Sequence, residues 1–318
     1  MNEPKVSVIV PVRNGAGKIE QCLKAVFSQS LTPYEVIVVD GHSTDGTVQE
    51  AQKYPVKVMY EDCGTRGGAC QKGIENAEGE YVAFTDADCI PDSNWLANLV
   101  GEFDDGIVGV GGQVIYTGNK FWERAITLAF ATFVGSANSI EGRLFQERRF
   151  VNSISGCNSI YRRQDILDVG GFNPYFISED TELNKRLLKK GKLLHIPKAV
   201  VTHEQEGSLK GFARRIHKWG RTRVITRKWD LQVAPPLIVP LLLLSLIFTY
   251  WIFLVALGLY LVITVIMGIK FAFQEKDAKY LFSIPTVYMV EHSSYTAGFW
   301  REVLWPHRRL KNSAKLDG

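Results

Sequence analysis

The N-terminal part of the chain alternates between short apolar runs and segments in which apolar residues recur at helical spacing. The runs are rich in β-branched residues and lack polar alternation, which is typical of strands covered on both faces. Strands that alternate with helices of about ten residues predict an α/β fold with a doubly wound, mostly parallel sheet flanked by helices. The apolar runs are residues 6–11, 36–39, 56–60 and 81–84, and the helices predicted between them are residues 18–28, 47–53 and 67–77.

The mixture of strands and helices continues further along the chain. Residues 107–112 predict a strand that ends in glycines, residues 200–203 predict another strand, and a helix is expected to begin after Ser178. Residues 121–142 have helical spacing, and either a core helix or a membrane-apposed helix fits them. The expected α/β domain covers residues 1–230, with halves at about 1–112 and 113–230.

A long apolar stretch follows this domain. Residues 233–273 carry one charged side chain, Lys270. A single helix of that length would measure roughly 60 Å, about twice the hydrocarbon thickness of a bilayer. Two transmembrane helices of about 20 residues fit better, with the turn at residues 249–251, where Tyr250 and Trp251 are typical interfacial residues. A buried helical hairpin of a soluble protein is the alternative.

Basic segments flank the apolar stretch. Between Ser208 and Lys228 there are eight Lys or Arg residues and no acidic residue, and further basic residues follow residue 273. The positive-inside rule then puts both ends in the cytoplasm, which predicts a multi-pass protein of the cell membrane with its α/β domain on the cytoplasmic side. We expect residues 274–306 to form an interfacial amphipathic segment and residues 307–318 a disordered tail.

Composition adds limits on partners and compartment. The formal net charge of +4 is mild, and we expect no nucleic-acid partner. The five cysteines form no Cys-x-x-Cys pair, which argues against a disulfide framework or a zinc cluster and fits reduced thiols in the cytosol. Residues 1–5 lead directly into the first strand, so we expect no cleaved signal peptide.

The strongest candidate chemistry lies in Asp86-Ala87-Asp88, at the end of an apolar run. Two close carboxylates repel each other unless a cation or hydrogen-bond donors lie between them. Oxygen ligands suit Mg²⁺ or Mn²⁺, and Mg²⁺ usually completes its shell with water and substrate phosphates. The motif therefore predicts a site for a cation and a diphosphate, although an isolated Asp-x-Asp is more often an acidic surface turn.

Other polar residues are expected at the same edge of the sheet. Asn14 and Asp40 follow two other strands, and ligands of such sheets bind outside the carboxyl ends of the strands. Arg66 and Lys72 flank two glycines near a helix start and could contact phosphate, or could be solvated surface bases. A dinucleotide fingerprint is not complete here, because Glu20 replaces the third glycine of G-x-G-x-x-G.

Together these motifs resemble the family-2 glycosyltransferases of the GT-A fold. The resemblance is carried by Ser7-Val8-Ile9-Val10-Pro11, by Val38-Val39-Asp40 with Ser43-Thr44-Asp45-Gly46-Thr47, and by Asp86-Ala87-Asp88. It extends over about residues 5–223. It implies inverting, metal-dependent transfer of a hexose-type sugar from a nucleotide-diphosphate donor, with the donor half of the domain first and the acceptor half second.

The resemblance also implies residue roles on the donor side. Asp40 is expected to contact the base or ribose, Asp86 to lie beside the ribose and diphosphate, and Asp88 to bind the Mg²⁺ or Mn²⁺ ion. His203 is expected to bind the same metal or the diphosphate, although a lone histidine is more often structural. The family often has a second Asp after Asp40, where this chain has Gly41-His42, so the nucleobase stays open. The donor-binding residues that follow from the resemblance are Pro11, Asn14, Asp40, Arg66, Lys72, Asp86, Ala87 and Gly156.

On the acceptor side the resemblance assigns the catalytic base to Asp180. An inverting transfer needs a carboxylate that takes the proton of the acceptor hydroxyl. The alternative is that Asp180 and Glu179 only complement the helix dipole behind a Ser178 N-cap, and this dipole would hold the pKa of Asp180 down. Glu179, Arg215 and Trp219 are the expected acceptor-binding residues. Phe212 stands where processive synthases have Gln, which argues against a polysaccharide synthase.

The predicted function is sugar transfer to a membrane-embedded acceptor at the cytoplasmic face, either a polyprenyl phosphate or a lipid-linked glycan. The basic segment before the hairpin fits this acceptor, and it equally fits contact with anionic lipid headgroups. A non-catalytic, membrane-tethered protein that binds nucleotide sugars or acts as a scaffold is the alternative. A nucleotidyltransferase is disfavoured, since the chain lacks a glycine-rich basic signature near its N-terminus.

Overall fold

The computed structural model describes residues 3–118, 120–137, 147–227, 229 and 231–306. The chain divides into two compact units. The first comprises Met1–Tyr116 and Leu144–Glu204, and the second comprises Thr117–Arg143 and Gln205–Gly318. Residues 205–230, which the sequence analysis included in the α/β domain, therefore group with the C-terminal helices.

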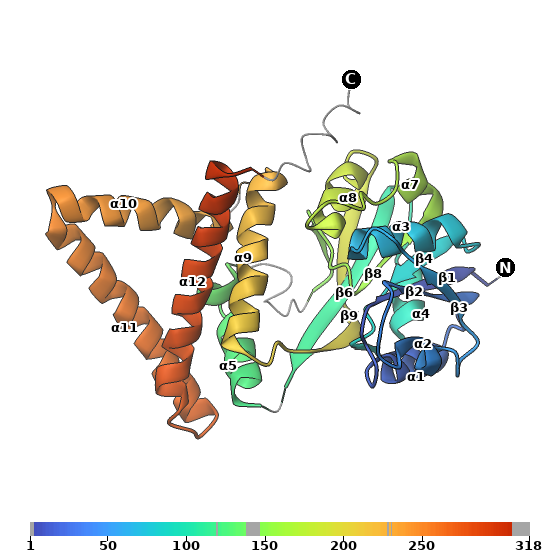
Figure 1. Cartoon of the computed structure of the whole chain (residues 1–318), viewed down its shortest axis with the longest axis horizontal. Coiled ribbons are helices and arrows are strands. Elements are labelled where there is room, and N and C mark those ends of the chain that lie inside the picture. The colour runs from blue at the N-terminus through green and yellow to red at the C-terminus, as the bar shows by residue number, and fades with distance from the viewer. Residues whose placement is uncertain (1–2, 119, 138–146, 228, 230, 307–318) are drawn as a thin grey trace. The chain divides into compact units, whose positions relative to one another are not determined.

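The first unit is built on a mixed β-sheet (Figure 1). Its strands are β1 (Val6–Val12), β2 (Glu35–Asp40), β3 (Lys57–Tyr60), β4 (Tyr81–Phe84), β5 (Cys89–Pro91), β6 (Ile107–Thr117), β7 (Arg149–Val151), β8 (Ser159–Arg162) and β9 (Lys192–Glu204). They lie in the order β3-β2-β1-β4-β8-β6-β9-β5, with β7 beside β9. β3, β2, β1 and β4 pair in parallel, so their carboxyl ends share one edge, as predicted. From β8 onward the sheet is extended by antiparallel pairs.

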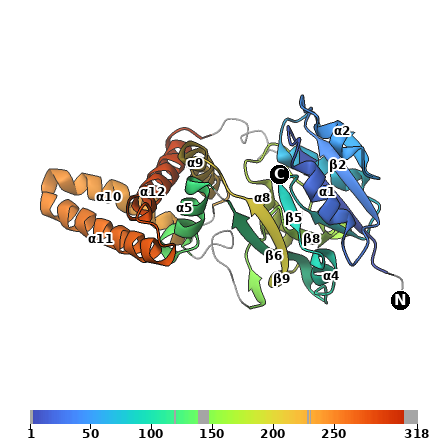
Figure 2. The same cartoon turned by 90° about the horizontal axis from the view of Figure 1, so that it is seen from below.

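Helices cover both faces of this sheet (Figures 1 and 2). They are α1 (Ile19–Phe27), α2 (Thr47–Ala51), α3 (Arg66–Asn76), α4 (Trp95–Val100), α7 (Arg163–Asp168) and α8 (Glu179–Leu187). Val8 and Val10 of β1 pack in one core with α1, α2 and α4, while Ile9 packs in the other with α3, α7 and α8. This explains the unbroken apolar run of β1, because successive side chains enter opposite cores.

A buried amide connects two neighbouring strands of the sheet, β6 and β9, with helix α4. The side chain of Asn158 is fully buried and donates to the carbonyls of Gln113 (2.9 Å) and Ala199 (3.0 Å). It also accepts a hydrogen bond from the indole Nε1 of Trp95 at 2.8 Å. The amide is thereby satisfied inside the core, and it ties α4 to β6 and β9 beside the active-site edge.

The second unit is helical. Its elements are α5 (Phe121–Phe130), α6 (Phe133–Ser136), α9 (Leu209–Ile225), a 3₁₀ turn η1 (Leu231–Val233), α10 (Ala234–Phe248), α11 (Tyr250–Gln274) and α12 (Tyr280–Leu304). Residues 121–142 were predicted to be helical. The structure has α5 and α6 there, and Ala125, Ile126 and Ala129 are buried, as the core-helix interpretation requires. Residues 138–142 lie outside the described part of the chain.

Helices α9 and α12 run side by side in both views and pack closely (Figures 1 and 2). A Cβ atom at Gly220 would overlap the backbone of Tyr295, and one at Gly298 would overlap the backbone of His217. Glycine at both positions thus lets the two backbones approach. Arg221 and the buried Glu302 add an ion pair of 2.8 Å between the same helices.

The predicted hairpin is present as α10 and α11, which meet at Thr249. Within the described residues, Leu231–Phe248 and Tyr250–Gln274 are long and apolar enough to cross a membrane, and about 11% of each apolar window is buried. Their large side chains, such as Ile247 and Phe248, are mostly exposed. Exposed apolar surface of this extent needs a lipid or protein environment.

The segment at residues 274–306, which was expected to be interfacial, is largely one helix, α12, packed against α9, α5 and α11. Ile284, Val287 and Phe299 are buried, so one face of α12 belongs to the helical core. Phe282 and Met289 remain exposed, which keeps contact with a membrane surface as a prediction for the other face. The tail predicted for residues 307–318 lies outside the described residues.

Candidate active site

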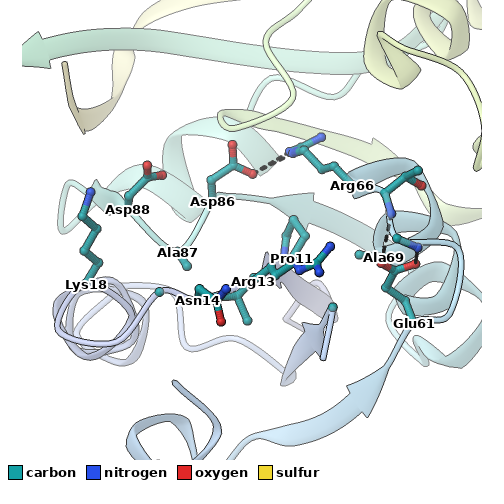
Figure 3. Close-up of a pocket in the computed structure, with 15 residues that line it drawn as sticks. Pro11, Arg13, Asn14, Lys18, Glu61, Arg66, Ala69, Asp86, Ala87 and Asp88 are labelled. Carbon is teal, nitrogen blue, oxygen red and sulfur yellow. Dashed lines mark hydrogen bonds and ion pairs between the residues drawn. The ribbon is translucent and has the colours of Figure 1, made fainter. Parts of the chain in front are cut away.

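A cavity of about 360 Å³ opens at the carboxyl edge of the parallel strands (Figure 3). Its lining comes from the segments that follow β1, β2, β3 and β4. Asp86 and Asp88 lie on one side of it, with Arg13 and Asn14 below them in Figure 3. The lining residues are Pro11, Val12, Arg13, Asn14, Gly15, Lys18, Gly41, Glu61, Gly64, Thr65, Arg66, Ala69, Asp86, Ala87 and Asp88.

The loop after β1 is held by the loop after β2. Asn14 adopts a left-handed conformation (φ 52°), and its side-chain oxygen accepts a hydrogen bond from the Thr44 N–H at 2.9 Å. The Asn14 N–H donates to Ser43 Oγ. Ser43 donates in turn to the buried carboxylate of Asp40 through its N–H (2.8 Å) and its hydroxyl (2.5 Å). Asp40 therefore shapes this loop and does not line the cavity, and its contact with a nucleotide stays a prediction.

The loop before α3 is organised by Glu61, which follows β3. The Glu61 carboxylate is nearly buried and accepts hydrogen bonds from the backbone N–H groups of Cys63, Gly64 and Thr65 at 2.9 to 3.1 Å. Thr65 is the N-cap of α3, because its hydroxyl accepts from the Gly68 N–H. These bonds fix the first residue of α3, Arg66, over the cavity.

Arg66 connects three segments of the site. Its Nε donates to Asp86 Oδ1, its Nη1 to Glu179 Oε1 and its Nη2 to the Gly156 carbonyl, each at 2.8 Å. The Arg66 side chain is 26% exposed and that of Glu179 9%. Three protein groups therefore engage the Arg66 guanidinium, and its contact with a donor phosphate stays a prediction. Its observed contacts hold the end of β4, the loop before β8 and the start of α8 together.

The glycines near Arg66 leave room for it and for its neighbours. A Cβ atom at Gly156 would lie 2.8 Å from Arg66 Nη1. The close approach that Gly156 permits in this structure is thus that of a guanidinium, where the sequence analysis expected a donor sugar. Gly67 and Gly68 are buried at the start of α3. A Cβ atom at Gly67 would meet the Asn173 carbonyl, and one at Gly68 would meet the Glu61 carboxylate, so both glycines are needed for close packing.

Asp180 lies in the first turn of α8, beside the Arg66 contacts. Its carboxylate accepts hydrogen bonds from the Gly156 N–H (3.1 Å) and the Thr181 N–H (2.7 Å). Burial raises the pKa of Asp180 and the neighbouring Glu179 charge raises it further, while Arg66 and the two N–H groups oppose the rise. The expectation of a lowered pKa was wrong, because burial and the Glu179 charge outweigh Arg66 and the two N–H groups. Ser178 occupies the N-cap position, but its side chain makes no capping hydrogen bond.

Asp88 and His203 lie close enough to share a cation. His203 Nε2 lies 3.6 Å from Asp88 Oδ1, and their side chains are 18% and 36% exposed. His203 Nδ1 lies 2.7 Å from the Glu204 carbonyl, which engages that nitrogen, so Nε2 is the ring nitrogen that faces Asp88. A carboxylate oxygen and an oriented imidazole nitrogen fit a divalent cation. Asp86, by contrast, is held by Arg66.

The remaining predicted residues fall in three groups. Pro11 and Ala87 line the cavity with the acidic pair. Lys72 is exposed on α3 and does not line it. Arg215 and Trp219 lie on α9 in the second unit, where the Arg215 guanidinium is 5.7 Å from the Trp219 ring centre and donates to Gln205.

Three charged lining residues were missed by the sequence analysis: Arg13, Lys18 and Glu61. Glu61 directly follows β3, so the rule that used Asn14 and Asp40 as strand-end residues would have found it. Arg13 and Lys18 lie on either side of Asn14, between β1 and α1. Only their position after a strand end could have indicated that they line the cavity.

We expect Arg66→Met to lower the free energy of unfolding by about 2–3 kcal/mol, because the substitution leaves the carboxylates of Asp86 and Glu179 half-buried without their partner. Lys72→Met, an exposed change on the same helix, should stay within about 0.5 kcal/mol of the parent. Denaturant unfolding of the purified chain measures both. Equal stability of the two variants would contradict the central position of Arg66.

Comparisons with known proteins identify the family of the chain. The family described as "Glycosyl transferase family 2" matches residues 7–170, about half of the chain. Glycosyltransferase AglE of Haloferax volcanii is 34% identical over a region covering 59% of this chain and 62% of that protein.

A second relative aligns over almost the whole chain. It is a dolichyl N-acetyl-α-D-glucosaminyl phosphate 3-β-D-2,3-diacetamido-2,3-dideoxy-β-D-glucuronosyltransferase of Methanococcus voltae, 23% identical over 94% of this chain and 97% of that protein. Among solved structures, the mannosyltransferase PcManGT from Pyrobaculum calidifontis, in complex with GDP-Man and Mn²⁺, shares the fold with a TM-score of 0.64 and 20% identity, covering 96% of this chain and 88% of that one. The chain therefore belongs to glycosyltransferase family 2 and has the GT-A fold.

Proposed function

We propose that this glycosyltransferase moves a sugar, with inversion and with the help of a divalent cation, from a nucleotide-diphosphate donor to a polyprenyl-linked acceptor at the cytoplasmic face of a membrane. The observation that carries the proposal is the Arg66 network. Through it, Asp86 at the cavity and Asp180 beside Gly156 belong to one connected site.

The cavity has the chemistry that a nucleotide diphosphate needs. Arg13 and Lys18 supply positive charge at its wall, and the Asp86 and Asp88 carboxylates face the same space. Asp88 and His203 would hold the cation, and a bound cation would neutralise the charge that develops on the leaving diphosphate. PcManGT, whose complex contains GDP-Man and Mn²⁺, supports this combination of donor and metal.

Asp180 supports the chemical step. The acceptor hydroxyl oxygen forms a bond to the anomeric carbon, Asp180 takes the hydroxyl proton, and the bond to the diphosphate oxygen breaks with its electron pair leaving on the nucleotide. A raised pKa makes the Asp180 carboxylate a stronger base than an ordinary aspartate. The opposing Arg66 charge and two N–H donors favour the ionised form.

The second unit supports a lipid-linked acceptor. Two of its helices are apolar enough to cross a membrane, and the exposed Lys210, Arg214 and Lys218 follow one another at intervals of four along α9. Such a basic stripe suits the anionic headgroups or phosphates of a membrane surface. The Methanococcus voltae relative is named for a dolichyl-phosphate-linked acceptor, which favours the same class here. Arg215 and Trp219 on the same helix remain our candidates for acceptor contact.

Asp180→Asn should lower the rate of sugar transfer by at least about 100-fold, because the amide cannot accept the proton. Donor binding in the presence of Mn²⁺ should persist, since the substitution preserves shape and leaves the cavity lining unchanged. Product formation and donor titration calorimetry measure the two effects. The exposed Asp105→Asn serves as the control, and loss of donor binding in Asp180→Asn would reject the base assignment.

The dependence of kcat/KM on pH should have an acidic limb above the ordinary aspartate range of about 3.9. Activity requires ionised Asp180, and burial together with Glu179 destabilises that form, so the rate falls as the pH drops through the raised pKa. Glu179→Gln removes the like charge and should move the limb to lower pH, whatever its effect on the maximal rate. Glu182→Gln, which changes an acid paired with Arg186 on the same helix, should leave the limb in place. An unmoved limb in Glu179→Gln would show that another group titrates.

A further inference from the structure

A thiol lies next to the proposed cation ligands. Cys89 follows Asp88 in sequence and begins β5, where it pairs directly with His203 of the antiparallel β9. Directly opposed residues of an antiparallel pair present their side chains on the same face of the sheet. The register therefore brings a sulfur and an imidazole together from distant parts of the chain.

The distances fit a shared cation. Cys89 Sγ lies 4.0 Å from Asp88 Oδ1, Asp88 Oδ1 lies 3.6 Å from His203 Nε2, and the three ligand atoms all lie within 4.8 Å of one another. Around a tetrahedral zinc-type ion, ligands at the usual bond lengths stand roughly 3.4–3.6 Å apart. Side-chain movements of a few tenths of an ångström to about one ångström would bring the three ligand atoms to these separations.

The histidine is already oriented for this role. Its Nδ1 is engaged by the Glu204 carbonyl, and the Tyr116 ring lies 5.3 Å from the imidazole. The other ring nitrogen, Nε2, faces Asp88. A carbonyl behind a ligating imidazole is the usual support of a metal-binding histidine.

We propose that Cys89 Sγ is a third protein ligand of the cation held by Asp88 and His203, and that the site consequently prefers a thiophilic divalent ion, such as Zn²⁺ or Co²⁺, over Mg²⁺. The inference rests on the proposed function only in placing this cation at the donor diphosphate. Imidazole and sulfur ligands select transition metals, whereas Mg²⁺ favours oxygen ligands throughout. Three protein ligands leave open positions for diphosphate oxygens, as catalytic sites require.

The alternative is that Cys89 only packs in the core and does not bind the cation. Its complete burial in a hydrophobic cluster that also contains Cys157 supports this alternative. The Cys157 thiol lies within hydrogen-bonding reach of the Cys89 thiol. Neither feature accounts for the closeness of the Cys89 sulfur to the polar side chains of Asp88 and His203. The two explanations differ in whether sulfur contributes to metal binding, which spectroscopy detects without any assay of sugar transfer.

The test is a Co²⁺ titration of the full chain, purified in detergent and freed of metal, in a Cys63→Ser background that removes the exposed thiol. We expect a near-ultraviolet sulfur-to-cobalt charge-transfer band that saturates at one ion per chain. Cys89→Ser should abolish the band, and Cys157→Ser, the matched change of a neighbouring buried thiol, should retain it. Asp88→Asn and His203→Gln should weaken Co²⁺ binding.

Direct titrations with Zn²⁺ and Mg²⁺ complete the experiment. Cys89→Ser should raise the Kd for Zn²⁺ by at least about tenfold, which is the effect on metal affinity that changes around a metal site usually have. The Kd for Mg²⁺ should stay unchanged. A saturated Co²⁺ complex without the band, a band that survives in Cys89→Ser, or an unchanged ratio of Zn²⁺ to Mg²⁺ affinity would each overturn the proposal. Sugar transfer by a protein without the band would refute the sulfur ligand alone, while the band in a protein inactive with every donor would refute the proposed function alone.

Discussion

The site depends on one guanidinium. Arg66 binds a carboxylate after β4, a carboxylate at the start of α8 and a carbonyl before β8, all at 2.8 Å. Removing a carboxylate from water costs desolvation free energy, and a distant positive charge does not offset this cost. A partly buried carboxylate therefore needs a close, hydrogen-bonded partner such as Arg66. The position of Arg66 follows in turn from Glu61, which closes the preceding turn through three backbone N–H groups. Local loop chemistry thus sets the distance between the donor cavity and the base.

The same ion pairs adjust the reactivity of Asp180. Its pKa is raised by burial and by Glu179, and Arg66 limits the rise by pairing with Glu179 and by its own charge. A base needs both partial desolvation and a means of remaining ionised near neutral pH. The Arg66–Glu179 pair provides this balance, since it neutralises the acid that would otherwise repel the ionised form of Asp180. The structural role of Arg66 and its proposed effect on the base therefore depend on the same contacts.

The parallel core and its edge could be predicted from sequence, because unbroken β-branched runs and strand-end polar residues are local signals. Asn14, Asp86 and Asp88 were placed correctly at the cavity for that reason. Roles that depend on contacts between distant segments could not be predicted. Gly156 looked like a donor-sugar contact, yet its missing Cβ admits Arg66.

Longer-range pairing explains the other differences. The closeness of Cys89 and His203 depends on the register of β5 with β9, which no spacing rule for cysteines reveals. Similarly, α12 has too many polar residues for a span and was read as interfacial, whereas glycines on α9 and α12 let it pack into the helical unit. Helix propensity and composition carry no information about such a partner.

The most direct measurement is product analysis with the purified full chain. A panel of nucleotide sugars is incubated with Mn²⁺ and with either a polyprenyl phosphate, a polyprenyl-diphosphate-linked sugar or a soluble sugar as acceptor, and lipids are examined by mass spectrometry. Family-2 transfer to a membrane acceptor predicts a polyprenyl-linked product that gains one sugar from one preferred donor, and no such product without Mn²⁺ or the polyprenyl chain. Equal transfer to the soluble acceptor, or donor binding without any glycosylated product, would contradict it.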